Sequence, residues 1–303
     1  MTDVPDDVRG LAADRADARR QRDFATADAL RDRIVELGYV VVDTADGYRL
    51  EAAEAEPAAA ARVRPDRVAS VLDEPATFDV SVEWVVEGWA EDVRRAIDAF
   101  AAHAGDRSVQ FVVVDVTGIE PGAFGGDVEV VRLVDGTGWG AARNAGLRRA
   151  RGSIVLVVDG SVEPTGDVLT PIERALADPT VGVCGPFGIV TSDLRAFEPS
   201  DGPDVDAVES YLMAFRRDVL AASGMFDEGF HWYRSADIEL SFRVKDHGLR
   251  AVVVDVPVRM HEHRMWANTP PDERARLSRR NFNRFLDRFR GRLDLTVRGA
   301  GDG

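Results

Sequence analysis

Two aspartates of this sequence stand where the side chains of a binding site often gather. Asp115 and Asp159 each follow an apolar run, QFVVV and IVLVV, that predicts a buried strand. Ligands of open α/β sheets bind beyond the carboxyl ends of the strands, so these two carboxylates are the first candidates for a site. For Asp115 the alternative is a solvated aspartate at a strand end.

A carboxylate pair begins a predicted helix further along the chain. Asp237 and Glu239 follow Trp232 and Tyr233, whose rings offer flat surfaces to a ligand. The helix dipole and the free N–H groups of the first turn keep a carboxylate ionised there. This arrangement suits a general base and equally a helix cap.

Two histidines and a set of arginines follow. His261 and His263 flank Glu262 on an extended segment, where alternate residues point to the same side, so both imidazoles are expected to face one site. Residues 264–298 contain ten arginines and four acidic residues, a net of +6. An anionic ligand would be drawn to this region, unless the arginines form a solvated helix face.

An alternation of apolar runs and helical patterns must position these residues. Runs that are apolar on both faces, separated by helices, are typical of a parallel sheet covered on both sides. We therefore predict an α/β fold, with a mixed, mainly parallel sheet flanked by helices. Strands are expected at 80–86, 110–116, 128–134 and 154–158, and helices at 92–103, 141–150 and 168–177. A C-terminal helix, with Phe282, Phe285 and Phe289 on one face, is expected to pack on the sheet domain.

The first 51 residues predict a small separate module of two helices and a hairpin. The helical pattern covers 8–38 and ends at Gly38, and the hairpin strands are expected at 39–42 and 48–50. Residues 52–76 include EAEPAAAARVR, which is poor in large apolar side chains and predicts a linker. The larger domain is then expected to cover residues 77–298.

Composition excludes several classes of protein. The chain is 45% hydrophobic and 30% charged, which excludes global disorder, and its formal charge of −15 leads us to expect no nucleic-acid partner. The single cysteine, Cys184, excludes an intramolecular disulfide and multi-cysteine metal sites. The acidic N-terminus does not resemble a signal peptide, and no apolar run approaches the roughly 20 residues that span a bilayer. We therefore expect a cytoplasmic protein without a membrane span.

Four segments, taken in order, resemble the family-2 glycosyltransferases. They are QFVVVD ending at Asp115, GWGAARNAGLRRARGSIVLVVDG at 138–160, YLMAFRRDVLAASGMFDEGF at 211–230, and YRSADIELSFRVKDHGLRAVVVDVPVRMHEH at 233–263. The resemblance implies the nucleotide-diphospho-sugar transferase type of fold. It also implies transfer of a sugar from a nucleotide-diphosphate donor to an unknown acceptor. A non-catalytic nucleotide-sugar sensor is the alternative.

The resemblance also implies roles for single residues. On the donor side, Asp115 would meet the nucleotide base, and Arg143, Asn144, Asp159 and Ser161 would lie near the diphosphate. For Arg143 and Asn144 the alternative is a helix surface charge and a local cap. On the acceptor side, Asp237 would be the general base with Glu239 as its backup, and Trp232 and Tyr233 would face the sugar ring of the acceptor.

A metal would be expected at a pair of aspartates separated by one residue, for which this sequence has Asp159-Gly160-Ser161. The resemblance implies Mn²⁺ or Mg²⁺ and places His261 and His263 near the metal or the diphosphate. These cations prefer several oxygen ligands, so a hydroxyl in place of the second carboxylate weakens the site considerably. Donor binding is then metal-independent, or another group such as Glu163 compensates, or the activity is lost.

The segment ADARRQRDFATADALRDRIVELGYVVVDTADGYRLE at 16–51 resembles the small C-terminal module of cysteinyl-tRNA synthetases. The catalytic and zinc-binding parts of those enzymes do not occur in the sequence, so we expect no synthetase activity. Residues 1–51 contain eight arginines and twelve acidic residues, a net of −4, which offers few phosphate contacts. The module is either a packing or interaction unit or part of a tRNA-associated adaptor.

Overall fold

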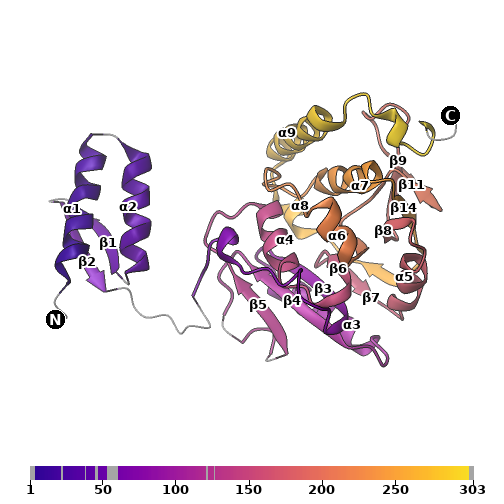
Figure 1. The fold of residues 1–303 in the computed structure, drawn as a ribbon, viewed down its shortest axis with the longest axis horizontal. Coiled ribbons are helices and arrows are strands. Elements are labelled where there is room, and N and C mark those ends of the chain that lie inside the picture. The colour runs from indigo at the N-terminus through magenta and orange to yellow at the C-terminus, as the bar shows by residue number, and fades with distance from the viewer. Residues whose placement is uncertain are drawn as a thin grey trace. The chain divides into compact units, whose positions relative to one another are not determined.

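A computed structural model describes residues 4–21, 23–37, 39–44, 47–52, 61–120, 122–125 and 127–299. The chain divides into two compact units, Met1–Ala61 and Arg62–Gly303 (Figure 1). Each unit is described by itself below.

The smaller unit is a helical hairpin with a two-stranded ribbon. Its elements are α1 (Asp6–Arg20), α2 (Phe24–Glu36), β1 (Tyr39–Thr44) and β2 (Gly47–Ala52), and β1 pairs with β2 in antiparallel register. The predicted helical stretch is divided at Asp23, whose carboxylate accepts hydrogen bonds from the backbone N–H and the hydroxyl of Thr26 and so caps α2. Val8, Ala12, Ile34 and Val41 form the core. Gly38, the predicted stop of the helix, lies outside the described residues.

An eight-stranded sheet forms the centre of the larger unit. Its strands, in spatial order, are β11 (Asp204–Val205), β14 (Arg250–Val253), β8 (Val181–Gly185), β13 (Leu212–Arg216), β6 (Gly152–Val158), β3 (Phe78–Val86), β4 (Val109–Asp115) and β5 (Val128–Arg132). Strand β3 runs parallel to both of its neighbours, β6 and β4. Strand β4 is also parallel to β5, and β8 is parallel to β14. Strands β13 and β11 run antiparallel to their neighbours. The predicted mixed, mainly parallel sheet is therefore confirmed.

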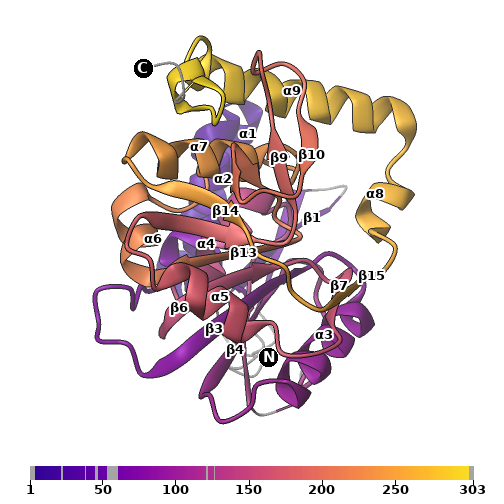
Figure 2. The same cartoon turned by 90° about the vertical axis from the view of Figure 1, so that its right-hand side faces the viewer.

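Helices cover both faces of this sheet (Figures 1 and 2). They are α3 (Ala90–Ala102), α4 (Trp139–Leu147), α5 (Leu169–Leu176), α6 (Arg217–Ser223) and α7 (Ala236–Asp246), and the chain continues with α8 (Arg264–Asn268) and α9 (Pro271–Phe289). Along β6, Leu156 and Val158 pack with α3 and α5, and Val155 and Val157 pack with α4, α6 and α7. This alternation explains why the run is apolar at every position.

The C-terminal helix packs on the sheet domain as predicted, and the helix that it contacts is α7. Phe285 and Phe289 of α9 are buried against Phe242 of α7, and Phe282 packs at the edge of the same cluster. Short elements complete the unit: β7 (Val162–Pro164) pairs with β15 (Val258–Met260), and β9 (Gly188–Val190) lies between β10 (Glu198–Ser200) and β12 (Ala207–Val208). The 3₁₀ turns are Pro65–Arg67 and Leu293–Leu295.

Part of the segment expected to be a linker packs on the larger unit. Val63 forms a bridge with Leu133, Val71 is buried, and the guanidinium of Arg217 donates to the carbonyls of Val71 and Glu74. Apolar burial and satisfied carbonyls therefore hold residues 62–76 against the sheet domain. Within the described ranges, no helix has the length and apolar character needed to cross a bilayer.

Candidate active site

A cavity of about 470 Å³ opens beyond the carboxyl end of β6. Its walls come from segments that are far apart in sequence: Asp159 after β6, residues 209–211 before β13, residues 233–238 at the start of α7, and His263 before α8. Five of the residues singled out from the sequence line it, namely Arg143, Asp159, Tyr233, Asp237 and His263. The cavity therefore brings together side chains from both the predicted donor and acceptor sets.

Asp237 is fixed in orientation at the first turn of α7. One carboxylate oxygen, Oδ2, accepts hydrogen bonds from the backbone N–H of Ser210 at 3.0 Å and from its hydroxyl at 3.3 Å, and Oδ1 accepts from the N–H of Ile238 at 2.9 Å. Burial is the largest effect on this carboxyl and raises its pKa, although these hydrogen bonds oppose the rise. A held carboxylate with a raised pKa is a stronger base than an exposed aspartate.

Glu209 is a second carboxyl in the same cavity, which the sequence analysis did not identify. Burial raises its pKa to about 7, the charge of Asp237 adds to the rise, and Arg234 opposes it. Glu209 lies in the short turn between β12 and β13, where no periodic pattern distinguishes it. The antiparallel placement of β13 between β6 and β8 brings that turn to the cavity.

Asp159 and Ser161 form one hydrogen-bonded turn. Oδ1 of Asp159 accepts from the backbone N–H of Ser161 at 2.8 Å and from its hydroxyl at 2.5 Å. Oδ2 of Asp159 faces Nε2 of His263 at 3.5 Å. Because Nδ1 of His263 accepts the N–H of Trp266 and so caps α8, the proton of the neutral ring lies on Nε2, toward Asp159.

Aromatic rings hold His263 at the wall of the cavity. Its imidazole stacks on Tyr233, with ring centroids 4.5 Å apart and an angle of 27° between the planes, and it meets Tyr211 edge-on at 5.7 Å. Both tyrosines line the cavity, and burial raises the pKa of each phenol. They therefore stay neutral hydrogen-bonding groups beside an apolar surface.

Trp232 does not line the cavity, although it was expected to face a ligand. Trp232 is 6% exposed, and its ring stacks on Trp266, with centroids 6.0 Å apart and an interplanar angle of 17°. Its carbonyl accepts a hydrogen bond from Asn281 of α9. Of the two expected aromatic surfaces, the structure thus presents Tyr233 alone to the cavity.

Arg143 makes its polar contacts mainly with buried groups of the protein. Its guanidinium donates to Oε2 of Glu83 at 2.8 Å and twice to the carbonyl of Val158 at 3.1 Å, and it lies over the ring of Trp139. Glu83 is fully buried in β3, and burial raises the pKa of its carboxyl to about 7 although Arg143 lowers it. Arg143 therefore fixes the carbonyl that directly precedes Asp159.

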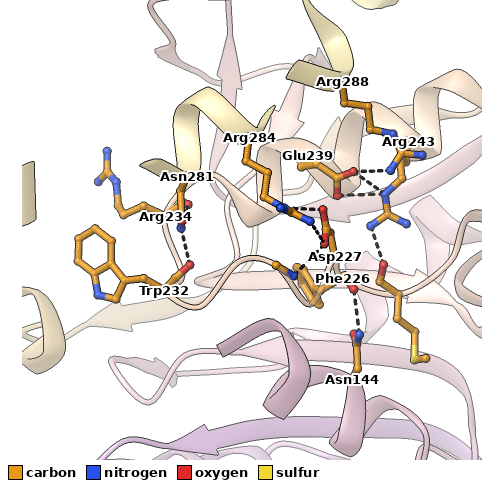
Figure 3. A network of polar contacts seen from close by, with 12 residues as sticks. Asn144, Phe226, Asp227, Trp232, Arg234, Glu239, Arg243, Asn281, Arg284 and Arg288 are labelled. Carbon is orange, nitrogen blue, oxygen red and sulfur yellow. Dashed lines mark hydrogen bonds and ion pairs between the residues drawn. The ribbon is translucent and has the colours of Figure 1, made fainter. Parts of the chain in front are cut away.

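Asn144 and Glu239 are anchors of the surrounding framework (Figure 3). The amide of Asn144 donates to the carbonyl of Phe226 at 2.8 Å and so holds the loop after α6. Glu239 is 1% exposed and accepts hydrogen bonds from Arg243 and Arg288. Its carboxylate is committed to these ion pairs and does not line the cavity, so Glu239 is not in place to back up Asp237.

Asp115 is buried and organises the loop that follows β4. Its oxygens accept hydrogen bonds from the backbone N–H groups of Thr117, Gly118 and Ile119, and from Arg132 at 3.3 Å. It is 1% exposed, which differs from both a solvated aspartate and a carboxylate open to a ligand. Its described contacts set the shape of loop 116–119.

A smaller cleft of about 30 Å³ borders Asp159 on the side of Ser161 and Arg264. Glu87 also lines it, and burial together with the charge of Asp159 raises the pKa of Glu87 to about 8. At neutral pH this carboxyl is largely protonated, so it adds little negative charge beside Asp159.

The residues expected near a metal fall into two separate contacts. Nε2 of His261 contacts Oε2 of Glu163 at 2.5 Å, whereas Nε2 of His263 faces Oδ2 of Asp159. The two histidines thus have different carboxylate partners. Nδ1 of His263 is engaged by the backbone, and one oxygen of Asp159 is engaged twice by Ser161. In the described part of the chain, no three His, Cys, Asp or Glu side chains come together as a metal would require.

Two families match this chain in separate segments. Residues 88–237 match the family model described as glycosyl transferase family 2, and residues 1–48 match that of the cysteinyl-tRNA ligase anticodon binding domain. Both resemblances seen in the sequence are therefore confirmed. The chain carries a family 2 glycosyltransferase domain, preceded by a module of the cysteinyl-tRNA ligase type.

Two curated relatives match the small module. The cysteine–tRNA ligase of Opitutus terrae is 48% identical over 52 residues, which are 17% of this chain and 11% of the ligase. The enzyme of Methanosarcina mazei is 40% identical over 52 residues, which are again 17% of this chain and 11% of the ligase. This chain thus spans about a tenth of the length of these ligases.

A solved structure supports the fold of the larger unit. GalNAc-T7, in a crystal structure with UDP, GalNAc and Mn²⁺, superposes with a TM-score of 0.56 and 17% identity, over 69% of this chain and 48% of that chain. At this identity the likeness shows the fold alone. The expected nucleotide-diphospho-sugar transferase type of fold is confirmed.

Proposed function

We propose that the larger unit is an enzyme that transfers a sugar from a nucleotide-diphosphate donor to an acceptor hydroxyl. The observation that carries the proposal is the single cavity that holds both Asp159 and Asp237 within a family 2 glycosyltransferase domain. GalNAc-T7, which has the same type of fold, was crystallised with UDP and GalNAc. A nucleotide diphosphate and a sugar are therefore the ligands to test first.

Asp237 is the general base of this proposal. The acceptor hydroxyl gives its proton to a carboxylate oxygen of Asp237, and its oxygen forms the new bond to the anomeric carbon. The bond from that carbon to the diphosphate breaks, and the diphosphate leaves with the electron pair. Ser210 keeps Asp237 aimed at the cavity, and burial of the carboxyl makes it more basic. Tyr233 offers its ring to the acceptor.

The donor side is built around Asp159. We infer that Asp159 and Ser161 contact the donor near its diphosphate, because both border the cleft beyond the end of β6. Asp115, Arg143 and Asn144 act as positioning residues, since they hold loop 116–119, the carbonyl of Val158 and the loop after α6. Loss of one of them should reduce donor affinity through the backbone that it holds.

Donor binding is proposed to depend little on Mn²⁺ or Mg²⁺. The GalNAc-T7 structure contains Mn²⁺, but here a serine hydroxyl stands beside Asp159, and His263 turns a protonated nitrogen to it. Such groups do not supply the several oxygen ligands that these cations prefer. His261 is engaged by Glu163 and is not proposed as a ligand.

A non-catalytic sensor of nucleotide sugars is the second candidate, and the specific observation that favours it is Ser161 in place of a carboxylate.

Calorimetric titration with the uridine, guanosine, thymidine, adenosine and cytidine diphosphates and their sugars, followed by a search for donor breakdown, tests both candidates. An enzyme binds one donor and consumes it with an acceptor or water. A sensor binds one donor and leaves it intact. No binding at millimolar concentration contradicts both.

The N-terminal module is proposed to act as an interaction unit. Its match to an anticodon binding domain makes tRNA the partner to test. Its net charge of −4 argues against tight binding to the phosphate backbone of tRNA. A gel-shift titration with total tRNA at low salt should therefore show no saturable complex, and a tight complex would contradict the proposal.

A further inference from the structure

Three arginines that border the cavity stay unpaired in the described part of the chain. They are Arg195, Arg234 and Arg279. Their guanidinium groups form no described hydrogen bond or ion pair. The charge of Arg234, which lies over the ring of Trp266 at 5.1 Å, acts on Glu209 and Asp237, and that of Arg195 acts on Asp193. An unpaired arginine is a donor of up to five N–H groups in a planar fork that fits a phosphate or a carboxylate.

The surrounding arginines behave differently. Arg243 and Arg288 are bound to Glu239, and Arg284 is bound to Asp227. Figure 3 shows Arg234 apart from these ion pairs, on the far side of Asn281. In the described part of the chain, three guanidinium groups without an ion pair border one cavity, which also holds the carboxyls of Asp159, Glu209 and Asp237.

The three arginines come from three elements that the framework holds in place. Arg195 follows Leu194, which is buried, and Asp193 accepts hydrogen bonds from the backbone N–H groups of residues 195 and 196. Arg279 is on α9. Asn281 of the same helix donates to the carbonyls of Trp232 and Arg234, so it ties α9 to the loop that carries the third arginine.

These arginines come from other elements than the residues of the proposed donor side. Asp159 follows β6 and Arg143 is on α4, whereas Arg195 is in the β9–β10 hairpin, whose tip reaches α9 in Figure 2, and Arg279 is on α9. Asp237 and Glu209 also line the cavity. A molecule bound to the arginines would therefore share the cavity with the proposed base.

We propose that the acceptor is a small hydroxylated anion, whose phosphate or carboxylate group is bound by Arg195, Arg234 and Arg279. This inference rests on the proposed function, because it names the substrate class of that site. The cavity of about 470 Å³ has the size of a small-molecule site. Phe197 and Phe282 line it near the arginines and pack against the carbon skeleton of the acceptor. The anionic group fixes the molecule so that one hydroxyl faces Asp237.

Oxyanion binding is tested first with inorganic phosphate and acetate on the full chain. Thermal unfolding is followed at increasing phosphate or acetate, with chloride at matched ionic strength as the reference, because a bound ligand raises stability by RT ln(1 + [L]/Kd). The variants are Arg195→Ala, Arg279→Ala and both together. Arg280→Ala is the matched control, since Arg280 is the next residue of α9 and does not line the cavity.

We expect a saturable stabilisation by phosphate or acetate in the wild type and in Arg280→Ala. Each cavity variant should weaken it about tenfold to hundredfold, as the loss of a charge-assisted hydrogen bond does. The stronger of the two anions identifies the acceptor as a phosphate or a carboxylate. No stabilisation of the wild type by either anion, or equal loss in Arg280→Ala and Arg279→Ala, overturns the proposal.

Donor binding separates this proposal from the proposed function. The affinity for the nucleotide diphosphate should be unchanged in the double variant. Turnover should be greater with glycerol 3-phosphate or glycerate than with glycerol, which lacks the charge. If the double variant loses nucleotide affinity, the arginines hold the donor diphosphate and the acceptor proposal is overturned, while the proposed function stands. If the wild type binds phosphate but no nucleotide, the proposed function fails, and with it the assignment of that anion as an acceptor.

Discussion

Replacing Arg143 by methionine is expected to destabilise the larger unit by several kcal/mol. Methionine keeps much of the side-chain volume but removes the cation that faces the fully buried Glu83 at 2.8 Å. It also removes both hydrogen bonds to the carbonyl of Val158. Removing one partner of a buried ion pair costs about 3–5 kcal/mol, because the other charge is left without compensation.

The pH dependence of this loss follows from Glu83. Burial raises its pKa from 4.5 to about 7, and removal of Arg143 raises it further because that cation lowers it. A carboxyl with a raised pKa in the folded state holds a proton that the unfolded chain releases, so the stability present below pH 4.5 is lost as pH rises toward the folded-state pKa. At about 1.4 kcal/mol per pH unit, the wild type loses about 3 kcal/mol from this group, and the variant loses more.

Denaturant unfolding at pH 5 and pH 8, followed by tryptophan fluorescence, measures the effect, because all five tryptophans lie between residues 84 and 266. The control is Arg276→Met, which removes an exposed pair with Glu273 and should cost less than about 1 kcal/mol. We expect the Arg143 variant to lose about 3–5 kcal/mol at pH 8 and clearly less at pH 5. A loss at pH 8 equal to that of the control would refute the reasoning.

Two further predictions concern the cavity. Ser161→Asp places a carboxylate beside Asp159 and should give donor binding a response to manganese that the wild type lacks. Calorimetry with and without a chelator measures this response. A wild type that loses its affinity for the donor in chelator would contradict the prediction. Sulfate, whose charge is constant near neutral pH, should bind the wild type more weakly as pH rises through about 7, because the ionised Glu209 then competes for Arg234 beside Asp237. Glu209→Gln should remove this dependence, and an unchanged profile in that variant would exclude Glu209 as its cause.

The parallel part of the fold could be predicted from sequence because its strands are buried on both faces. The runs that end at Asp115 and Asp159 are apolar at nearly every position, and the structure places them in β4 and β6. The antiparallel insertion of β13 between β6 and β8 was not predicted. An antiparallel central strand has the same apolar composition as a parallel one, so its direction does not appear in the pattern.

The candidate site could be predicted in part for a related reason. Asp159 was found because it follows an apolar run that predicts a strand, and Asp237 because it begins a predicted helix at the place that the family resemblance assigns to the general base. Arg143 and Glu239 have the same kind of position, but the structure gives them buried ion pairs. A spacing of four residues on one helix indicates the pair of Glu239 with Arg243, whereas the pairs of Arg143 with Glu83 and of Glu239 with Arg288 join residues far apart in the sequence. Pairings of this kind depend on which strands and helices pack together.

The most direct measurement of the central claim compares Asp237→Asn with the wild type in donor turnover and in donor affinity. If Asp237 is the general base, the amide should lower the rate about 10²–10⁴-fold and leave the affinity for the nucleotide diphosphate nearly unchanged. Asp246→Asn makes the same chemical change at the exposed end of α7, where the side chain pairs with Arg292, and should keep full activity. A folded Asp237→Asn protein that turns over donor at the rate of the wild type would contradict the claim and leave Asp237 as a helix cap.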